Sequence, residues 1–371
     1  MEETIKIHCE NTGSELHVKP GTTLSEVLSM LALKSKSETP FLAAYVNNRL
    51  KELYYQIFNP VSLRFVDITH FEGMRVYQRT LFFVMQKAVR DLFPGQRLHI
   101  KHSVAKGFYC EIEGMEEVSL DQIKAIENRM HELVAQDIPI IRQKLLSEEA
   151  IQLYTKLGMP DKIALLETRP HLYVTLYMMA DLAGYFYGSL APSSAYVPLF
   201  GLHKYYKGIH LSVPCRTHPS ELEHMVPQRK MFDVFNEYTR WVDVLGVATI
   251  GALNARILGG GGGDLIKIAE AFHEKKLANI ADQIAEANET GGGRIVLISG
   301  PSSSGKTTFA KRLSIQLRIL GMHPVVISLD DYFVNREQTP KDEKGEYDNV
   351  RYRGYVYINP SKIKVMRPGV S

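Results

Sequence analysis

One glycine-rich run near the C-terminus constrains the fold of this chain more than any other feature. Residues 300–307 read GPSSSGKT, which fits the phosphate-binding pattern G-x-x-x-x-G-K-[ST]. The preceding residues 294–299 (RIVLIS) are apolar and β-branched, and this composition predicts a buried parallel strand. Apolar residues at helical spacing follow the loop and end at Gly321, which predicts a helix. A chance turn rich in glycine and serine is the alternative.

The loop is predicted to hold the phosphates of ATP together with Mg²⁺. The backbone N–H groups of such a loop turn toward the phosphates, and the helix N-terminus adds the positive end of its dipole. Lys306 is expected to reach the β- and γ-phosphate oxygens, and the Thr307 hydroxyl is expected to join the Mg²⁺ shell. The predicted nucleotide-binding residues are Gly300, Ser302, Ser303, Ser304, Gly305, Lys306, Thr307 and Thr308.

A second predicted strand, residues 324–329 (PVVISL), ends at a pair of aspartates. Ligands of open α/β sheets bind at the carboxyl ends of the strands. Asp330 is therefore the predicted catalytic base beside the γ-phosphate, acting with Lys306, and Asp331 is the weaker alternative. A turn or a helix cap is the structural alternative for this pair.

Length and composition describe an ordinary globular protein. The 371 residues allow two or three domains, and a net charge of +3 is too small to indicate nucleic acid or membrane by itself. The three cysteines, Cys9, Cys110 and Cys215, are far apart, which is typical of free thiols in a reducing compartment. No apolar run reaches about 18 residues, and the N-terminus has no apolar segment typical of a signal peptide. We therefore expect a cytoplasmic protein without a membrane partner.

Residues 1–68 are predicted to form a small β-rich module. Strands are expected at residues 4–8, 15–18, 43–46 and 62–67, with a short helix ending at Leu31. The run HCENTGSELHVKPGTTLSEVL, followed by AAYVNNRLKELYYQI, resembles the TGS domain. This ubiquitin-like β-grasp module is found at the N-terminus of threonyl-tRNA synthetases.

Residues 69–225 extend this resemblance. A helix at 73–91, strands near 98–104 and 107–112, and a long helix at 120–146 resemble the second additional domain of threonyl- and alanyl-tRNA synthetases. In those enzymes, H-x-x-x-H and C-x-x-x-H motifs edit mischarged tRNA. The expected histidine positions are here Val76 and Thr80, and the segment DLAGYFYG has neither cysteine nor histidine. The resemblance predicts an α+β scaffold without editing chemistry, and leaves a binding role open.

The other histidines are expected to be structural or exposed. His99 and His102 lie on a predicted strand, and His131 begins an H-E-x-x-H pattern that the chain does not complete. Cys215 and His218 provide half of a metal site without a second pair.

Residues 226–290 are predicted to be a helical linker. A continuous helix over 231–258 has a broad apolar face that can dock on the second domain, on the nucleotide-binding core or on a partner subunit. The five glycines 259–263 favour a flexible break over a second phosphate loop. Asp264 is expected to cap a helix over 265–288.

The C-terminal segment carries a further resemblance. GPSSSGKTTFAKRLSIQLRILG and VVISLDDYFVNREQTPKDEKGEYD resemble the uridine kinase/phosphoribulokinase family, in particular bacterial uridine kinase-like proteins with TGS and synthetase-type domains. The resemblance implies transfer of the ATP γ-phosphate to a ribose hydroxyl of a nucleoside, with Asp330 as the catalytic aspartate. It places Tyr332, Phe333 and Arg336 toward the nucleoside. Residues 291–371 would then form a partial P-loop kinase domain.

We therefore expect a multidomain protein of α/β and α+β class: a ubiquitin-like module, an editing-domain-like module and a partial P-loop parallel-sheet core. The main functional expectation is an ATP-dependent kinase whose end is truncated, since the basic residues 349–371 depart from the family pattern. A divergent tail and a basic contact segment are the alternatives for that end. The competing hypothesis is a catalytically incomplete ATP-binding protein whose N-terminal domains bind RNA or the ribosome. A fragment whose N-terminal domains alone fold well is a third possibility, and an oligomer stays open.

Overall fold

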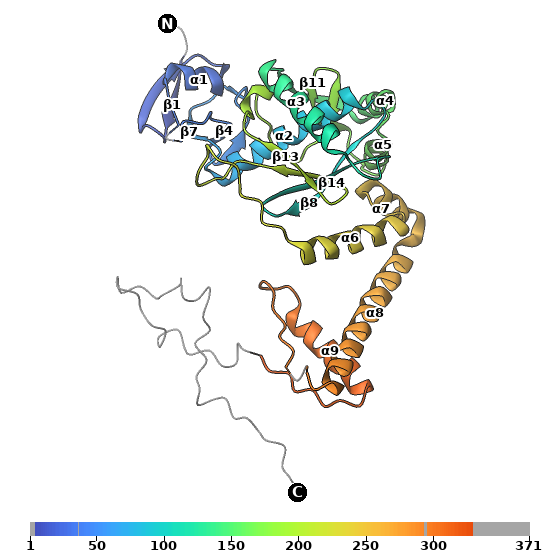
Figure 1. Ribbon diagram of the computed structural model, residues 1–371. Coiled ribbons are helices and arrows are strands. Elements are labelled where there is room, and N and C mark those ends of the chain that lie inside the picture. Colours follow the sequence, from blue (N-terminus) through green and yellow to red (C-terminus); the bar gives the residue numbers. More distant parts are fainter. Residues whose placement is uncertain (1–3, 36, 293–294, 329–371) are drawn as a thin grey trace, which may run out of the picture. The chain divides into compact units, whose positions relative to one another are not determined.

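The computed structural model describes residues 4–35, 37–292 and 295–328 (Figure 1). The chain divides after Gly260 into two compact units, residues 1–260 and 261–371. Its helices and several separate sheets make it a mixed α/β protein of more than one unit, as expected. None of the helices in the described ranges is both long enough and apolar enough to cross a membrane.

The N-terminal module is a five-stranded sheet in the order β2-β1-β7-β4-β5, with β1 and β7 parallel at its centre. Alternation along β1 turns Ile7 and Cys9 into the core and His8 to solvent. Helix α1 begins at a capping box, in which the Thr23 hydroxyl accepts from Glu26 N–H and the Glu26 carboxylate accepts from Thr23 N–H. The elements are β1 (Ile5–Cys9), β2 (Ser14–Val18), β3 (Thr22–Thr23), α1 (Leu24–Met30), β4 (Ala43–Val46), β5 (Arg49–Lys51), β6 (Gln56–Ile57) and β7 (Val61–Val66).

The strands and the helix expected within residues 1–68 are thus present, with a two-stranded β3–β6 ribbon added.

The next module is built on a four-stranded antiparallel sheet, ordered β13-β14-β9-β8. Its strands are β8 (Leu98–Val104), β9 (Gly107–Ile112), β13 (Gly201–Tyr205) and β14 (Gly208–Ser212). Helices α2 (Phe71–Leu92) and α3 (Leu120–Ala135) pack on one face, and Figure 1 shows α6 on the other.

A third sheet, β10-β11-β12, lies beside this one and carries helices α4 (Ser147–Leu157) and α5 (Pro160–Glu167). Its strands are β10 (Ile140–Leu146), β11 (Tyr173–Met179) and β12 (Leu182–Gly184), and a 3₁₀ turn, η1 (Ser194–Tyr196), follows. The long helix expected over residues 120–146 is therefore wrong. Helix α3 ends at Ala135 because Asp137 has a φ of 49° and Pro139 follows, and neither continues a helix. The chain then pairs with β11 from Ile140↔Met179 to Leu146↔Tyr173.

The continuous helix expected over 231–258 is also interrupted. Helix α6 (Arg229–Val244) ends where Gly246 adopts a φ of 68°, and Val247 N–H closes the end on Val242 O at 3.1 Å. Helix α7 (Ile250–Arg256) then packs on α5. Gly251 permits this approach, since a Cβ there would lie 2.6 Å from the Leu165 backbone nitrogen.

The second unit contains a helical pair in its described part. A π-helical turn (Ile257–Gly261), with Gly260 at a φ of 81°, leads into α8 (Gly262–Glu289) at the five-glycine run. Asp264 lies in the first turn of α8 and not at its N-cap, which is Gly261. Helix α9 (Lys306–Ile319) packs on α8 through a small apolar cluster centred on Leu277, Ala281, Leu313 and Leu317.

Candidate nucleic-acid interface and phosphate-binding loop

The phosphate-binding loop adopts the turn that its sequence requires. Helix α9 begins at Lys306 as expected, and its N-cap Gly305 has a left-handed φ of 81°. Ser303 also has a positive φ, of 60°, and Ser304 N–H closes the turn on Pro301 O at 3.3 Å. The loop residues 301–305 are exposed, as are Thr307 and Thr308 in the first helical turn. The loop therefore presents a helix N-terminus and several hydroxyl groups to solvent.

Lys306 is folded onto the loop itself. Its Nζ donates to Gly300 O at 2.9 Å and to Pro301 O at 2.7 Å, so its ammonium lies over the loop. A Cβ on Gly300 would lie 2.8 Å from Ser304 Oγ, which shows how closely the chain is folded at that point. A helix N-terminus, a lysine and an exposed threonine hydroxyl form a donor set that fits a phosphate with its Mg²⁺.

The parallel sheet expected around this loop is not formed in residues 295–300 and 322–328. The expected strand residues in both runs form neither a strand nor a helix, and Ile295, Leu297 and Val325 are more than 80% exposed. A strand needs a neighbour for its N–H and C=O groups, and the described part of this unit supplies only helices. The P-loop core is therefore not confirmed. Asp330, Asp331, Tyr332, Phe333 and Arg336 lie outside the described residues.

The two positions expected in place of editing histidines are part of the core. Val76 and Thr80 are fully buried on α2. The Thr80 hydroxyl donates to Val76 O at 2.8 Å and accepts from Ala191 N–H at 2.9 Å, so it ties α2 to the segment after β12. One turn further, Phe83 meets Phe186 with ring centroids 5.3 Å apart. These side chains are occupied by packing and leave no free acid, base or metal ligand there.

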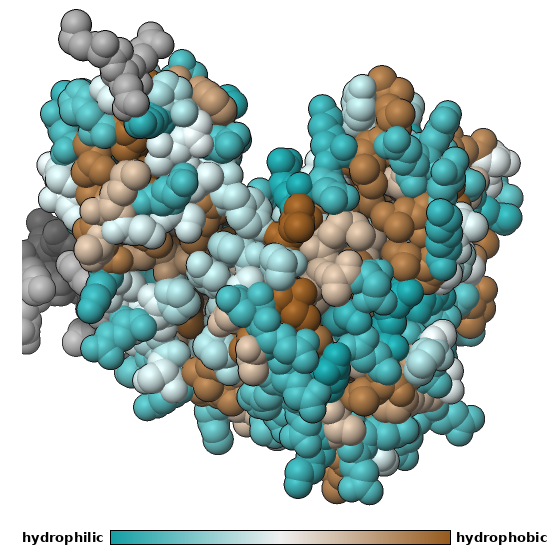
Figure 2. All heavy atoms as spheres, turned by 90° about the horizontal axis from the view of Figure 1, so that it is seen from above, coloured by the Kyte–Doolittle hydropathy of each residue, from teal (hydrophilic) through white to brown (hydrophobic). Residues whose placement is uncertain are grey.

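Polar side chains join the N-terminal module to the β10-β11-β12 sheet. The Tyr177 hydroxyl bonds the Glu52 carboxylate and lies 3.1 Å from Gly188 O, and the Tyr54 hydroxyl donates to Ile140 O. Arg142 Nε lies 3.6 Å from the same Glu52 carboxylate. Burial, followed by the bond and charge of Glu52, raises the pKa of Tyr177, which therefore stays a neutral donor. On the face seen in Figure 2, the surface is hollowed between the N-terminal module on the left and the larger module.

Basic side chains lie over aromatic rings on this first unit. Arg75 lies 4.2 Å from the centroid of the Phe71 ring on α2, and Lys144 lies 4.5 Å from the Tyr173 ring across β10 and β11. Phe71 and Tyr173 are both about half exposed. Three further pairs are Lys51 over Tyr55, Arg64 over Tyr45 and Arg169 over Tyr185. Proteins that bind single-stranded nucleic acid commonly stack bases on exposed aromatic rings and place cations beside them.

His99, His131 and Cys215 contact neighbouring side chains. His99 Nε2 lies 3.1 Å from Glu113, a carboxylate whose pKa is held down to about 2 chiefly by the hydrogen bond from Arg97. His131 stacks on Phe200 with centroids 4.4 Å apart. Cys215 Sγ lies 4.0 Å from His218 Nδ1, but the described ranges contain no group of three or more residues suited to a metal.

The N-terminal half of the chain is similar to curated threonine–tRNA ligases. The ligase of Rubrobacter xylanophilus is 30% identical over 190 residues, which is 51% of this chain and 29% of that protein. Those of Marinobacter nauticus and Clostridium kluyveri are 29% identical over 164 residues and 25% identical over 191 residues. The match to the Marinobacter ligase covers 44% of this chain and 26% of that protein. The match to the Clostridium ligase covers 51% of this chain and 30% of that protein. The chain thus spans less than a third of these relatives. No protein-family model matches it.

These relatives support the TGS and synthetase-like modules and overturn the kinase expectation. The relatives are tRNA ligases, and none of those named is a phosphotransferase. The interpretation of the chain as a uridine kinase-type enzyme with a nucleoside acceptor is therefore wrong. The RNA-binding alternative agrees better with the similarity.

Sequence reasoning did not single out the residues of the junction between the modules. Glu52 lies 90 residues before Arg142 and 125 residues before Tyr177, and no local pattern brings it together with them. The Phe71–Arg75 pair carries a usable signal, because an aromatic and a basic residue four positions apart share one helix face.

Proposed function

We propose that the chain binds RNA of the tRNA class through its first unit, and that the loop of its second unit binds ATP with Mg²⁺. The observation that carries the RNA proposal is the match of half the chain to proteins named as threonine–tRNA ligases. In this proposal the TGS-like module is residues 1–68 and the synthetase-like module residues 69–225. A helical linker (226–290) and the nucleotide-binding segment (291–371) follow.

The surface chemistry supports this proposal. Bases of unpaired RNA stack on aromatic rings and on guanidinium planes, while lysine and arginine neutralise phosphates. Arg75 with Phe71, and Lys144 with Tyr173, supply both functions on the first unit. Thr80 and Val76 are tied into the core, so the proposed activity is binding without ester hydrolysis.

In the second unit, the proposed phosphate ligands are the backbone N–H groups of residues 302–306, the Lys306 ammonium and the side chains of Thr307 and Thr308. The self-bonded Lys306 supports this role, because its ammonium already lies over the loop and can exchange two carbonyl partners for phosphate oxygens. Mg²⁺, when bound, would neutralise phosphate charge, and the Thr307 hydroxyl would be its protein ligand.

Fluorescence anisotropy with a labelled tRNA transcript tests the RNA proposal. The full chain is expected to bind with an affinity that falls steeply with salt. The Lys144→Ala/Tyr173→Ala variant should lose about tenfold in affinity and reduce the salt slope by about one. Lys267→Ala, which removes an exposed lysine of α8, is the matched control and should bind as the parent does. Absence of binding at low salt would refute the proposal.

Equilibrium binding of ATP with Mg²⁺ tests the loop independently. Lys306→Ala should abolish most ATP binding and leave tRNA binding unchanged, since the two sites lie in different units. Equal ATP affinity of the variant and the parent would contradict the role of the loop.

A further inference from the structure

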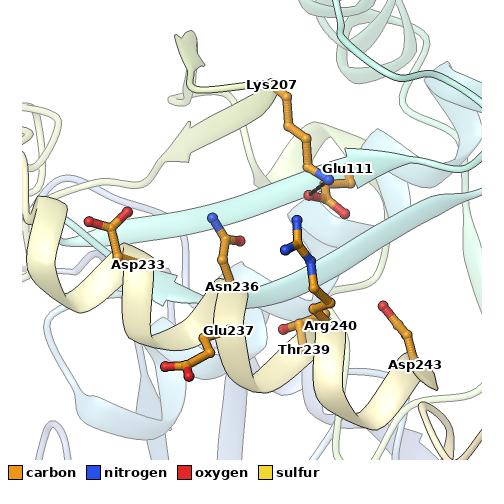
Figure 3. A pocket seen from close by; sticks show the side chains of 8 residues that line it. All are labelled: Glu111, Lys207, Asp233, Asn236, Glu237, Thr239, Arg240 and Asp243. Carbon is orange, nitrogen blue, oxygen red and sulfur yellow. Dashed lines mark ion pairs between the residues drawn. The ribbon is translucent and has the colours of Figure 1, made fainter. Parts of the chain in front are cut away.

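A polar groove lies between helix α6 and the β13-β14-β9-β8 sheet, and none of the proposed RNA-binding residues lines it (Figure 3). Its volume is about 530 Å³. Six of its side chains come from α6, and two come from β9 and from the turn between β13 and β14. They are Glu111, Lys207, Asp233, Asn236, Glu237, Thr239, Arg240 and Asp243.

The sheet side of the groove carries one more positive than negative charge. The Glu111 carboxylate accepts from the Tyr109 hydroxyl at 2.9 Å and lies 3.5 Å from Lys101 Nζ and 3.3 Å from Lys207 Nζ. Two ammonium groups and a phenol therefore hold one carboxylate, whose side chain is only 21% exposed. Because Glu111 already faces two ammonium groups, a further cation beside it is not neutralised by this carboxylate.

Arg240 is such a cation. Figure 3 shows its guanidinium rising from α6 toward Glu111 and Lys207. Asp243 lies three residues away on the same helix, a spacing at which arginine and aspartate commonly pair. Within the described chain, however, Arg240 makes no ion pair. The donors of this guanidinium, beside the Asn236 amide, face into the groove.

The outer parts of the groove carry the opposite charge. Asp233 and Asp243 stand at the two ends of the α6 segment in Figure 3, with Glu237 between them in sequence. The Asp233 side chain is 62% exposed, and its partner Arg229 is 4.0 Å away at the outer limit of an ion pair. Cationic charge is thus concentrated at the centre of the groove and carboxylates surround it.

We propose that this groove binds a small zwitterionic molecule that carries one carboxylate and at least one ammonium group. Arg240, with Lys207 and the Asn236 amide, receives the carboxylate, because a guanidinium fork matches carboxylate geometry. One of the two aspartates at the ends of the groove, Asp233 or Asp243, receives the ammonium. A simple anion would meet the surrounding carboxylates, and a simple cation would meet Arg240, so only a molecule with both charges satisfies both regions. The proposal does not depend on RNA or ATP binding.

A series of compounds that differ in one charge tests this inference on the full chain. L-Lysine and 6-aminohexanoate carry both charges, hexanoate lacks the ammonium, and cadaverine lacks the carboxylate. Trp241, the single tryptophan of the chain, is next to Arg240 on α6, so its fluorescence reports binding locally. Saturation-transfer NMR provides a second readout on the ligand. We expect saturable binding of the two zwitterions, and at least tenfold weaker binding of hexanoate and of cadaverine.

Two variants separate the groove from the rest of the surface. Arg240→Gln should weaken zwitterion binding by about tenfold or more, since it removes the charged donor to the carboxylate. Lys230→Gln removes an exposed cation that lies on the same helix but does not line the groove, and this variant should bind as the parent does. Circular dichroism confirms that both variants remain folded. Equal binding of hexanoate, equal binding of cadaverine, or unchanged binding by Arg240→Gln would each overturn the proposal, as would the absence of saturation at millimolar concentrations.

Discussion

At the scale of single residues, two hydroxyl groups of α2 show how buried polar side chains hold the module together. Thr80 is completely buried, and its hydroxyl both donates to Val76 O and accepts from Ala191 N–H. Tyr77 does the same at Leu199, donating to its carbonyl and accepting from its N–H at 2.7 and 2.9 Å. These bonds fix the two segments that follow β12 against α2, so the geometry of the module depends on them.

Replacing Thr80 by valine tests this role. The change keeps the shape of the side chain but leaves Ala191 N–H buried without a partner, which costs about 1–3 kcal/mol of folding free energy. Thr80→Ser keeps the hydroxyl and should cost less. Urea unfolding monitored by far-UV circular dichroism measures both. An equal loss in the two variants would mean that the methyl group, and not the hydrogen bond, stabilises this position.

At the scale of elements, the attachment of α6 decides how the groove is formed. Phe232 is 2% exposed and packs among Tyr109, Tyr205 and Tyr206, while Phe235 stacks on His102 with ring centroids 4.2 Å apart. Burial lowers the pKa of His102, against the smaller effect of Glu111, and its Nε2 is buried without a hydrogen-bond partner in the described structure. The neutral imidazole therefore favours the docked helix.

This attachment should weaken in acid. Because the pKa of His102 in the folded chain lies below its ordinary value of 6.5, stability is complete above pH 6.5 and falls as the pH is lowered toward the folded-state pKa. Trp241 fluorescence should report release of α6 in this range. His102→Phe keeps an aromatic ring on Phe235 without a titrating group, and should shift the transition to lower pH. An identical pH profile in the variant would exclude His102 as the cause.

The apolar contact of α6 can be tested separately. Phe232→Ala opens a cavity in the aromatic cluster and should cost about 3–5 kcal/mol of folding free energy. Met231→Ala is the matched control, since Met231 is half exposed on the same helix. Hydrogen exchange across α6 should rise in the first variant only. Unchanged protection in Phe232→Ala would contradict the docking of α6 through this residue.

At the scale of the whole molecule, the two units have separate cores. In the second unit α9 packs on α8 around Leu313 and Leu317, and Glu274 of α8 bonds both Arg312 and Gln316. Leu313→Ala should therefore destabilise this helical pair by about 2–5 kcal/mol and leave the first unit unchanged. Hydrogen exchange of α8 and α9, compared with that of β9 and β14, measures the difference. Loss of protection in both units would show that they unfold together.

Sequence reasoning was accurate where local rules decide the structure. The strand expected at residues 4–8, the short helix ending near Leu31 and the helix that follows the phosphate loop rest on local signals, and the structure bears them out. The predicted helices were too long at Asp137 and at Gly246, because the apolar periodicity continues past residues whose positive φ ends the helix. The β-branched runs beside the phosphate loop predicted strands, yet a strand also needs a partner, which no local pattern supplies. The junction of Glu52 with Tyr177 is likewise a product of tertiary packing.

The most direct test of RNA binding by the first unit is ultraviolet crosslinking of the full chain to a tRNA transcript, with the crosslinked peptides identified by mass spectrometry. Aromatic side chains that stack on bases crosslink efficiently, so adducts are expected at Phe71 and Tyr173, and they should disappear at high salt as the complex dissociates. Adducts confined to residues 261–371, or none at low salt, would contradict the account.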